Sequence, residues 1–274
     1  MVRIFVPVNF SDYTINAVNY ALKLGQKIPS VISLISCREP LSDSDEGRVD
    51  SKDYEEQLRL FKEDVAARLS TVQKENINLL TRIETGYPED VLVEISVKEE
   101  PDVIVMGTRS KGETIKELLG SVTSDVIKNA TVPVLAVPAE SSVDVEKISH
   151  VLFVTDFSDT DYRSFHKLIR LIAPFQTKIF AVHFRAVEPD KWDKNRLEEM
   201  RLYCYQTYRN YDVEFNFITG DDFIDSLDSF IAENNIDLIA MTRRKRNMIS
   251  KILHPSITRK ILFHTDIPLL VFHE

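Results

Sequence analysis

The sequence predicts two α/β domains in tandem, each a doubly wound parallel sheet flanked by helices. Short apolar runs of the kind found in buried strands alternate with longer stretches of helical periodicity along the 274 residues. The whole pattern also occurs twice, over residues 1–140 and again over residues 147–274. A repeat of this length indicates a duplicated domain, and the polar residues 139–148 read as the linker between the two copies.

Matching segments at the start and end of each copy reveal the duplication. Residues 4–12 read Ile-Phe-Val-Pro-Val-Asn-Phe-Ser-Asp, and residues 151–159 read Val-Leu-Phe-Val-Thr-Asp-Phe-Ser-Asp. Near the ends, Val-Pro-Val-Leu-Ala-Val around Pro133 matches Ile-Pro-Leu-Leu-Val-Phe around Pro268. The starts are 147 positions apart and the prolines 135, so the second copy is shorter. We expect the polar residues 41–53 to be the extra loop of the first copy.

Apolar periodicity places the elements of each copy. In the first copy we expect strands at 3–8, 31–36, 77–83, 102–106 and 133–137, and helices at 14–26, 54–75, 88–99 and 115–129. In the second we expect strands at 150–155, 178–184, 212–218, 237–241 and 268–272, and helices at 161–173, 190–209, 222–234 and 250–263. The runs 103–106 and 238–241 are continuously apolar, as in strands that are buried on both faces. Strands that alternate with helices in this way predict one five-stranded parallel sheet per copy.

Composition excludes several classes of protein. With 34 basic and 43 acidic residues, the net charge of -9 argues against a nucleic-acid binder. Two cysteines exclude a disulfide scaffold and a cysteine zinc site, and the six histidines lack metal-ligand spacing, so no metal site is expected. No apolar run reaches the length of a membrane span, and the first apolar run is too short for a signal peptide, so we expect a cytoplasmic protein.

A ligand is expected where strands one and four of each copy end, because ligands of doubly wound sheets bind there. After strand four, the first copy holds Gly107, Gly112 and Gly120, three of the seven glycines of the chain. Backbone amides of such a loop at a helix N-terminus favour phosphate, and Ser121 and Thr123 add hydroxyl groups. From spacing alone, a simple turn followed by a helix break is an equally good interpretation.

Two better-known phosphate motifs do not fit this loop. Glu113 stands where a Walker A loop needs its lysine, and a carboxylate there would repel phosphate. The turn after strand one, Val8-Asn-Phe-Ser, lacks the glycines of a dinucleotide-binding fingerprint.

These motifs resemble those of a tandem universal stress protein. Gly107, the nine residues 111–119, Gly120 and Ser121 match the family pattern Gly-x2-Gly-x9-Gly-[Ser/Thr], with Ser110 at the second glycine. The Asn/Asp-Phe-Ser-Asp element and the Val-Pro-Val strand also match. The resemblance implies a Rossmann-like fold of the adenine-nucleotide alpha-hydrolase type, which binds ATP across strands one and four, with magnesium on the phosphates.

The resemblance also implies which residues of the first copy would bind the nucleotide. Those on the adenosine side are Pro7, Val8, Asn9 and, through its backbone, Ser36. Those on the ribose and phosphate side are Met106, Gly107, Arg109, Ser110, Gly120, Ser121, Val122 and Thr123.

Two departures weaken this site without abolishing it. Asn9 replaces the usual aspartate, and although its carbonyl can still accept a hydrogen bond, the lost charge costs about 1 kcal/mol. Ser110 replaces a glycine, which costs about 1 kcal/mol if that position needs a positive φ. Otherwise its hydroxyl could help to hold phosphate.

The second copy has the opposite departures. It keeps the acidic residue, Asp156, but Thr242 and Pro255 replace Gly107 and Gly120. Proline has no N–H, so we do not expect a family-type ATP site here. Residues that could instead bind an anion are Asp156, Arg243, Arg244, Arg246 and Ser256. A solvated loop and helix face, or a docking patch for acidic partners, are the alternatives.

The Asn/Asp-Phe-Ser-Asp element also has a plainer interpretation. No histidine can be assigned to Asp156 and Ser158 as partner of a nucleophile. We favour helix capping, with Ser11 or Asp12, and Ser158 or Asp159, bonded to the first free amides.

Three functions remain open. The first is a stress or signalling protein that binds an adenine nucleotide in the first copy, the second is a nucleotide-free partner of other proteins, and the third is a slow ATPase, for which no catalytic base is identifiable. The resemblance further implies that the two domains form an intramolecular pseudo-dimer through strands 133–137 and 268–272. Whether a homodimer of the chain also forms stays open.

Overall fold

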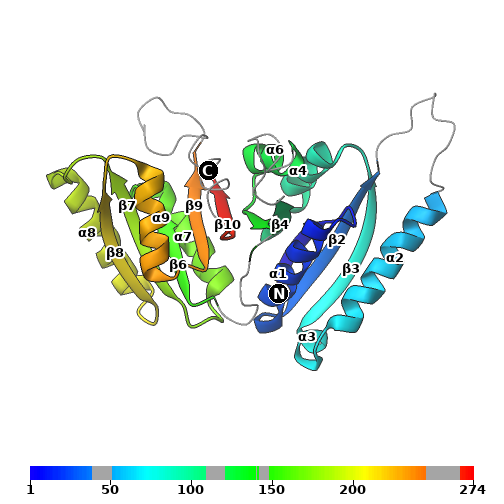
Figure 1. Ribbon diagram of the computed structural model, residues 1–274. Helices are drawn as coiled ribbons and strands as arrows, with labels where there is room; N and C mark the ends of the chain where they lie inside the picture. The colour runs from blue at the N-terminus through cyan, green and yellow to red at the C-terminus, as the bar shows by residue number, and fades with distance from the viewer. Residues whose placement is uncertain (39–50, 109–120, 140, 142–147, 245–265) are drawn as a thin grey trace. The chain divides into compact units, whose positions relative to one another are not determined.

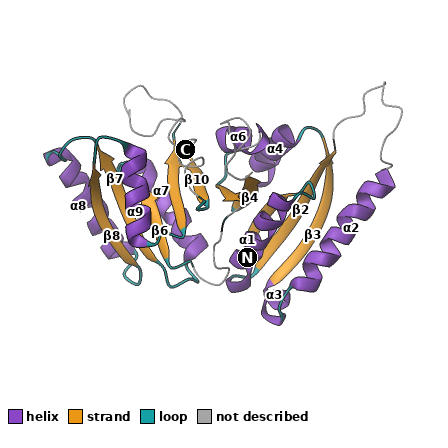
Figure 2. Ribbon diagram, viewed as in Figure 1, coloured by secondary structure: helices purple, strands orange, loops and turns teal. Residues whose placement is uncertain are grey.

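A computed structural model describes residues 1–38, 51–108, 121–139, 141, 148–244 and 266–274 (Figure 1). Strands and helices alternate along both halves of the chain (Figure 2). The chain divides into two compact units, Met1–Ala139 and Glu140–Glu274, and each is described by itself. No described helix is long and apolar enough to cross a membrane.

The first unit contains a parallel sheet with the strand order β3-β2-β1-β4-β5. Its strands are β1 (Val2–Pro7), β2 (Ser30–Arg38), β3 (Ile77–Thr85), β4 (Val103–Thr108) and β5 (Val134–Pro138). Its described helices are α1 (Asp12–Lys27), α2 (Ser51–Arg68), α3 (Thr71–Asn76), α4 (Pro88–Glu99) and α6 (Ser121–Asn129). Right-handed crossovers place α1 and α2 on one face of the sheet and α4 and α6 on the other.

The second unit repeats this arrangement, with the strand order β10-β9-β6-β7-β8. Its strands are β6 (His150–Val154), β7 (Lys178–Arg185), β8 (Asp212–Thr219), β9 (Leu238–Arg243) and β10 (Leu269–His273). Its described helices are α7 (Asp159–Ile172), α8 (Lys191–Thr207) and α9 (Phe223–Asn234). The doubly wound α/β fold is therefore confirmed in both copies. The helix expected at 250–263, and residues 115–120 of another, lie outside the described residues.

One expected helix is in fact two. The prediction of a single helix over 54–75 is wrong, because α2 ends at Arg68 and α3 begins at Thr71. Ser70 and Gln73 form a capping box. The Ser70 hydroxyl accepts from the Gln73 amide at 3.3 Å, and the Gln73 side chain accepts from the Ser70 amide at 3.0 Å. At its other end α2 begins at Ser51, inside the stretch expected to be loop.

The fourth strand of each unit is deeply buried. Residues 103–106 of β4 and 238–241 of β9 are all at most 3% exposed, as their continuously apolar sequences predicted. In each unit the strand order reverses between the first and fourth strands. The carboxyl ends of β1 and β4, and of β6 and β9, therefore form the edge where a ligand is expected.

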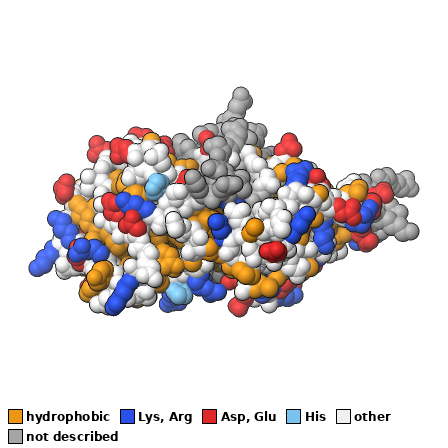
Figure 3. Space-filling model, turned by 90° about the horizontal axis from the view of Figure 1, so that it is seen from below, with side chains coloured by type: hydrophobic (Ala, Val, Ile, Leu, Met, Phe, Trp, Pro, Cys, Tyr) orange, Lys and Arg blue, Asp and Glu red, His pale blue; other side chains and the backbone are white. Residues whose placement is uncertain are grey.

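Charges on the outer helices are balanced locally. On the face in Figure 3, acidic and basic side chains are interspersed, with hydrophobic ones between them. On α2, Arg59 pairs with Glu56 at 2.6 Å and with Glu63 at 2.5 Å, and on α8 Arg201 pairs with Glu198 at 2.6 Å. All of these side chains are more than half exposed, so the pairs add little to stability.

Candidate functional site

A phenylalanine in the left-handed conformation follows the first strand of each unit. Phe10 has φ 63° and Phe157 has φ 56°, values that a bulky side chain rarely adopts. Packing holds them there. The Phe10 ring lies 5.9 Å from that of Tyr54 and 5.6 Å from that of Phe61, and Phe157 is only 2% exposed. The turn directs the preceding polar residue toward the following helix.

In the first unit, this turn uses the carbonyl oxygen of Asn9. The oxygen accepts bonds from the Ser11 amide at 3.3 Å, from the Ser11 hydroxyl at 2.6 Å and from the Thr14 hydroxyl at 2.6 Å. The amide nitrogen of Asn9 donates to the Tyr13 hydroxyl at 2.7 Å. Ser11 is the N-cap residue of α1, but its side chain makes no cap bond to the helix. Its hydroxyl bonds to the Asn9 oxygen instead, so of the two capping residues expected here, Ser11 or Asp12, Ser11 does not cap the helix.

A pocket of about 280 Å³ opens at the carboxyl ends of β1 and β4 and at the start of α6. Its described lining residues are Pro7, Val8, Asn9, Tyr13, Thr14, Ile35, Cys37, Pro88, Met106, Gly107, Ser121, Val122 and Thr123. Eight of these are residues that the family resemblance implied: Pro7, Val8, Asn9, Met106, Gly107, Ser121, Val122 and Thr123. Three other implied residues, Arg109, Ser110 and Gly120, lie outside the described residues.

Ser36, which was expected to bind through its backbone, is not among the described residues that line the pocket. It is fully buried, and its hydroxyl donates to the Val8 carbonyl at 3.2 Å. Side chains alternate between the two faces of a strand, so its neighbours Ile35 and Cys37 face the pocket instead. Strand alternation around Ser36 could have identified both. Tyr13 and Thr14, in the first turn of α1, and Pro88, at the start of α4, carried no comparable sequence pattern.

Gly107 is needed for packing against α1. A Cβ at this position would lie 2.3 Å from the carbonyl oxygen of Tyr13 and 2.7 Å from its carbonyl carbon. The Thr123 hydroxyl donates to the Gly107 carbonyl at 3.1 Å, and Thr123 is 5% exposed. Both residues therefore hold β4, α1 and α6 together at the floor of the pocket.

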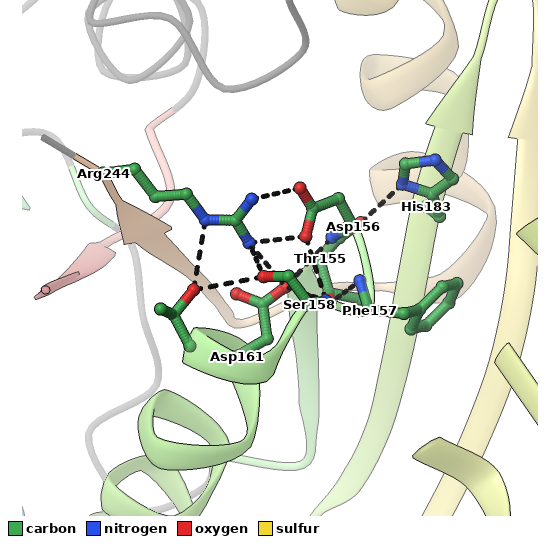
Figure 4. Close-up of polar contacts among 8 residues, drawn as sticks. Thr155, Asp156, Phe157, Ser158, Asp161, His183 and Arg244 are labelled. Atoms are coloured by element: carbon green, nitrogen blue, oxygen red, sulfur yellow. Dashed lines mark hydrogen bonds and ion pairs between the residues drawn. The ribbon is translucent and has the colours of Figure 1, made fainter. Parts of the chain in front are cut away.

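In the second unit, Arg244 reaches the residues that follow the first strand (Figure 4). Its guanidinium group forms a fork with both carboxylate oxygens of Asp156 and also bonds the Ser158 hydroxyl. It further contacts the Thr160 hydroxyl and a carboxylate oxygen of Asp161, each at 3.1 Å. The Arg244 side chain is 12% exposed, that of Asp156 15%, and that of Asp161 is fully buried.

This cluster shifts the proton affinities of its members. Burial raises the pKa of Asp156, but its hydrogen bond and ion pair with Arg244 outweigh burial and hold that pKa at about 2. Burial, reinforced by the charge of Asp156, raises the pKa of Asp161. Burial lowers the pKa of Arg244, but the two carboxylates outweigh this effect and raise it, so the guanidinium stays charged.

The inward direction of Arg244 bears on the anion site expected in this copy. Its charge faces two carboxylates, so an anion could use it only by breaking these contacts. Arg243, the last residue of β9, is half-buried, and burial lowers its pKa. Arg246 and Ser256 lie outside the described residues.

Two aromatic residues of the second unit stand at positions equivalent to two pocket-lining residues of the first. The register of the strands and helices aligns Phe184 with Cys37 and Phe223 with Pro88. The two rings meet edge to face with centroids 5.1 Å apart, and the pocket beside them measures only about 10 Å³. That space is about the minimum for one water molecule.

His183 occupies the position that Ser36 has in the first unit. It donates from Nδ1 to the Thr155 carbonyl at 2.8 Å, just as Ser36 donates to Val8. Burial lowers the pKa of His183, so the ring stays neutral at physiological pH. Among the described residues, no group of three or more histidines, cysteines and carboxylates is placed to hold a metal ion.

Both units match a known family. Residues 1–138 and 147–273 each match the universal stress protein family, and the chain therefore belongs to it. It is a tandem member, with two such domains in one chain.

Individual relatives match one domain or the whole chain. Universal stress protein MJ0531 of Methanocaldococcus jannaschii is 30% identical over 141 residues, which is 49% of this chain and 81% of that protein. The crystal structure of a universal stress protein from Archaeoglobus fulgidus DSM 4304 covers 99% of this chain and 98% of its own, with 19% identity and a TM-score of 0.73. A universal stress protein solved in complex with cAMP covers 50% of this chain and 96% of its own, at 22% identity and a TM-score of 0.39. At 19% identity, the similarity to the Archaeoglobus protein supports a shared fold and nothing further.

Proposed function

We propose that the first domain binds one adenine nucleotide, that the second domain binds none, and that the nucleotide serves a signalling or stress-protective role. The observation that carries this proposal is the pocket of about 280 Å³ where β1 and β4 end, the position at which doubly wound sheets bind ligands. Ser121 and Val122 of its lining begin α6, and a helix N-terminus favours phosphate. Arg109, Ser110 and Gly120 would complete the phosphate side, with magnesium on the phosphates.

The second domain supports the single-site part of the proposal. Phe184 and Phe223 fill the space that the pocket occupies in the first domain, and Arg244 covers the acidic residue after the first strand. A nucleotide there would have to displace both an aromatic pair and a buried ion pair.

A nucleotide-free interaction protein is the second candidate. It is favoured by Asn9, whose carbonyl oxygen already accepts three bonds within its own turn and is not available to a ligand hydroxyl. A slow ATPase has less support, because the described lining residues of the pocket include no carboxylate or histidine to act as a base.

The proposal can be tested by introducing phenylalanine into the first domain at the two positions equivalent to Phe184 and Phe223. In the double variant Cys37→Phe/Pro88→Phe, the added rings stand where the same fold already accommodates Phe184 and Phe223. The variant should fold normally and lose binding of ATP with Mg²⁺ in isothermal titration calorimetry. Val97→Phe is the matched control, because it adds a ring to an exposed position of α4. Binding retained by the double variant, or absent from the unmodified chain at millimolar ATP, would refute the proposal.

A further inference from the structure

The turn after β1 determines which atom of Asn9 remains for a ligand. The Ser11 backbone N–H can only donate, so the side-chain atom that faces it at 3.3 Å must be the carbonyl oxygen. The hydroxyls of Ser11 and Thr14 point at the same oxygen. The NH₂ group is therefore left on the other side. One of its hydrogens serves the Tyr13 hydroxyl, and the group keeps a second donor.

The second domain shows the same turn with an aspartate. Oδ1 of Asp156 accepts from the Ser158 amide at 3.0 Å, as the Asn9 oxygen accepts from Ser11. The other oxygen, Oδ2, takes the place of the Asn9 NH₂ group and binds the cation of Arg244. The same turn thus presents a hydrogen-bond acceptor, Oδ2 of Asp156, in the second domain. At the equivalent position of the first domain it presents a donor, the NH₂ group of Asn9.

Other side chains around the first pocket can also donate hydrogen bonds. The described lining includes no carboxylate, and it offers the hydroxyl of Ser121 and the thiol of Cys37. Burial, reinforced by the nearby charge of Glu84, raises the pKa of Cys37 to about 11, so it stays a protonated S–H donor.

We propose that Asn9 is a specificity-determining residue of the first domain. Its NH₂ group makes the pocket select a ligand with a hydrogen-bond acceptor oxygen at this point. An aspartate at the same position would instead select a hydroxyl or an amine. This inference rests on the proposed nucleotide binding. In a purine nucleotide, the oxygen is either a carbonyl on the base in place of the 6-amino group, or a phosphate in place of a ribose hydroxyl. Matching donor to acceptor is worth about tenfold in affinity.

Two ligand pairs distinguish these sources. ITP and ATP differ in the 6-oxo and 6-amino groups of the base, and adenosine 3′,5′-bisphosphate and AMP differ at the ribose. We expect the unmodified chain to prefer the first member of one pair by about tenfold in calorimetric titration. We call the pair whose two members bind with different affinities the responding pair, and it identifies the part of the ligand that faces Asn9.

Variants at Asn9 test the mechanism. Asn9→Asp should reverse the preference in the responding pair, because the aspartate keeps the turn, as Asp156 does, and presents an oxygen. Asn9→Ala should abolish the preference without reversing it. Unmodified protein that binds both members of each pair equally, or an unchanged preference in Asn9→Asp, would overturn the inference while nucleotide binding itself stands. No binding of ATP, AMP or adenosine 3′,5′-bisphosphate would instead refute the proposed function.

Discussion

Replacing Arg244 with alanine should destabilise the second domain by about 3 kcal/mol, within the range for breaking a buried ion pair. The change leaves Asp161, which has no exposed surface, and Asp156, whose side chain is 15% exposed, without their cation. It also removes the bonds of the guanidinium to the hydroxyls of Ser158 and Thr160. We expect the low end of the range, because water can reach Asp156 and the carboxyls can take up protons.

The loss should depend on pH in a defined direction. The folded pKa of Asp156, about 2, lies below its ordinary value of 3.8. Its contribution to stability is thus complete above pH about 4 and is lost as the pH falls toward about 2. Asp161 acts in the opposite sense, because its folded pKa is raised. Without Arg244, burial raises the pKa of both carboxyls. The stability difference between the unmodified chain and Arg244→Ala should therefore be largest at neutral pH and shrink on acidification.

Denaturant unfolding, monitored by tryptophan fluorescence, measures this effect in the second domain. The only tryptophan of the chain, Trp192, lies on α8 of the second unit. Arg201→Ala is the control, since Arg201 is 61% exposed, pairs with an exposed Glu198 and should cost less than about 0.5 kcal/mol. A loss for Arg244→Ala no larger than that of the control, or a loss that does not shrink in acid, would refute the reasoning.

Three further predictions follow from the packing. Gly107→Ala should destabilise the first domain by about 2 kcal/mol in thermal unfolding, because its Cβ would meet the Tyr13 carbonyl; an unchanged melting temperature would contradict this. Ser70→Ala should cost about 1 kcal/mol through loss of the α3 cap, whereas the neighbouring exposed change Val72→Ala should cost less; equal effects would count against the cap. Cys37, with a pKa of about 11, should react slowly with iodoacetamide at neutral pH and faster toward that pKa, and bound nucleotide should protect it; rapid reaction at neutral pH would be inconsistent with the burial of the thiol.

The fold was predictable because its determinants are local and repeated. The continuously apolar runs 103–106 and 238–241 and the alternation of strands with helices suffice for two doubly wound sheets. The break between α2 and α3 was not predicted, because apolar periodicity continues across Ser70. The Ser-x-x-Gln capping box that marks the break is nevertheless present in the sequence.

The chemistry of the site was predictable only in part. Residues next to the ends of β1 and β4 could be placed from the motifs. The role of Arg244 could not, because its partner Asp156 lies 88 positions away and the contact depends on how β9 ends beside β6. The carbonyl of Asn9 was expected to be available to a ligand, and its use by Ser11 and Thr14 becomes evident only from the left-handed turn at Phe10.

The stoichiometry of nucleotide binding tests most directly whether one of the two domains alone retains an open site. Native mass spectrometry of freshly purified protein, followed by titration with ATP and Mg²⁺, counts the nucleotides on each chain. We predict one nucleotide per chain at saturation, with none added in the Cys37→Phe/Pro88→Phe variant. Two nucleotides per chain would contradict the proposal that Arg244, Phe184 and Phe223 prevent binding in the second domain, and none would contradict the proposed site in the first.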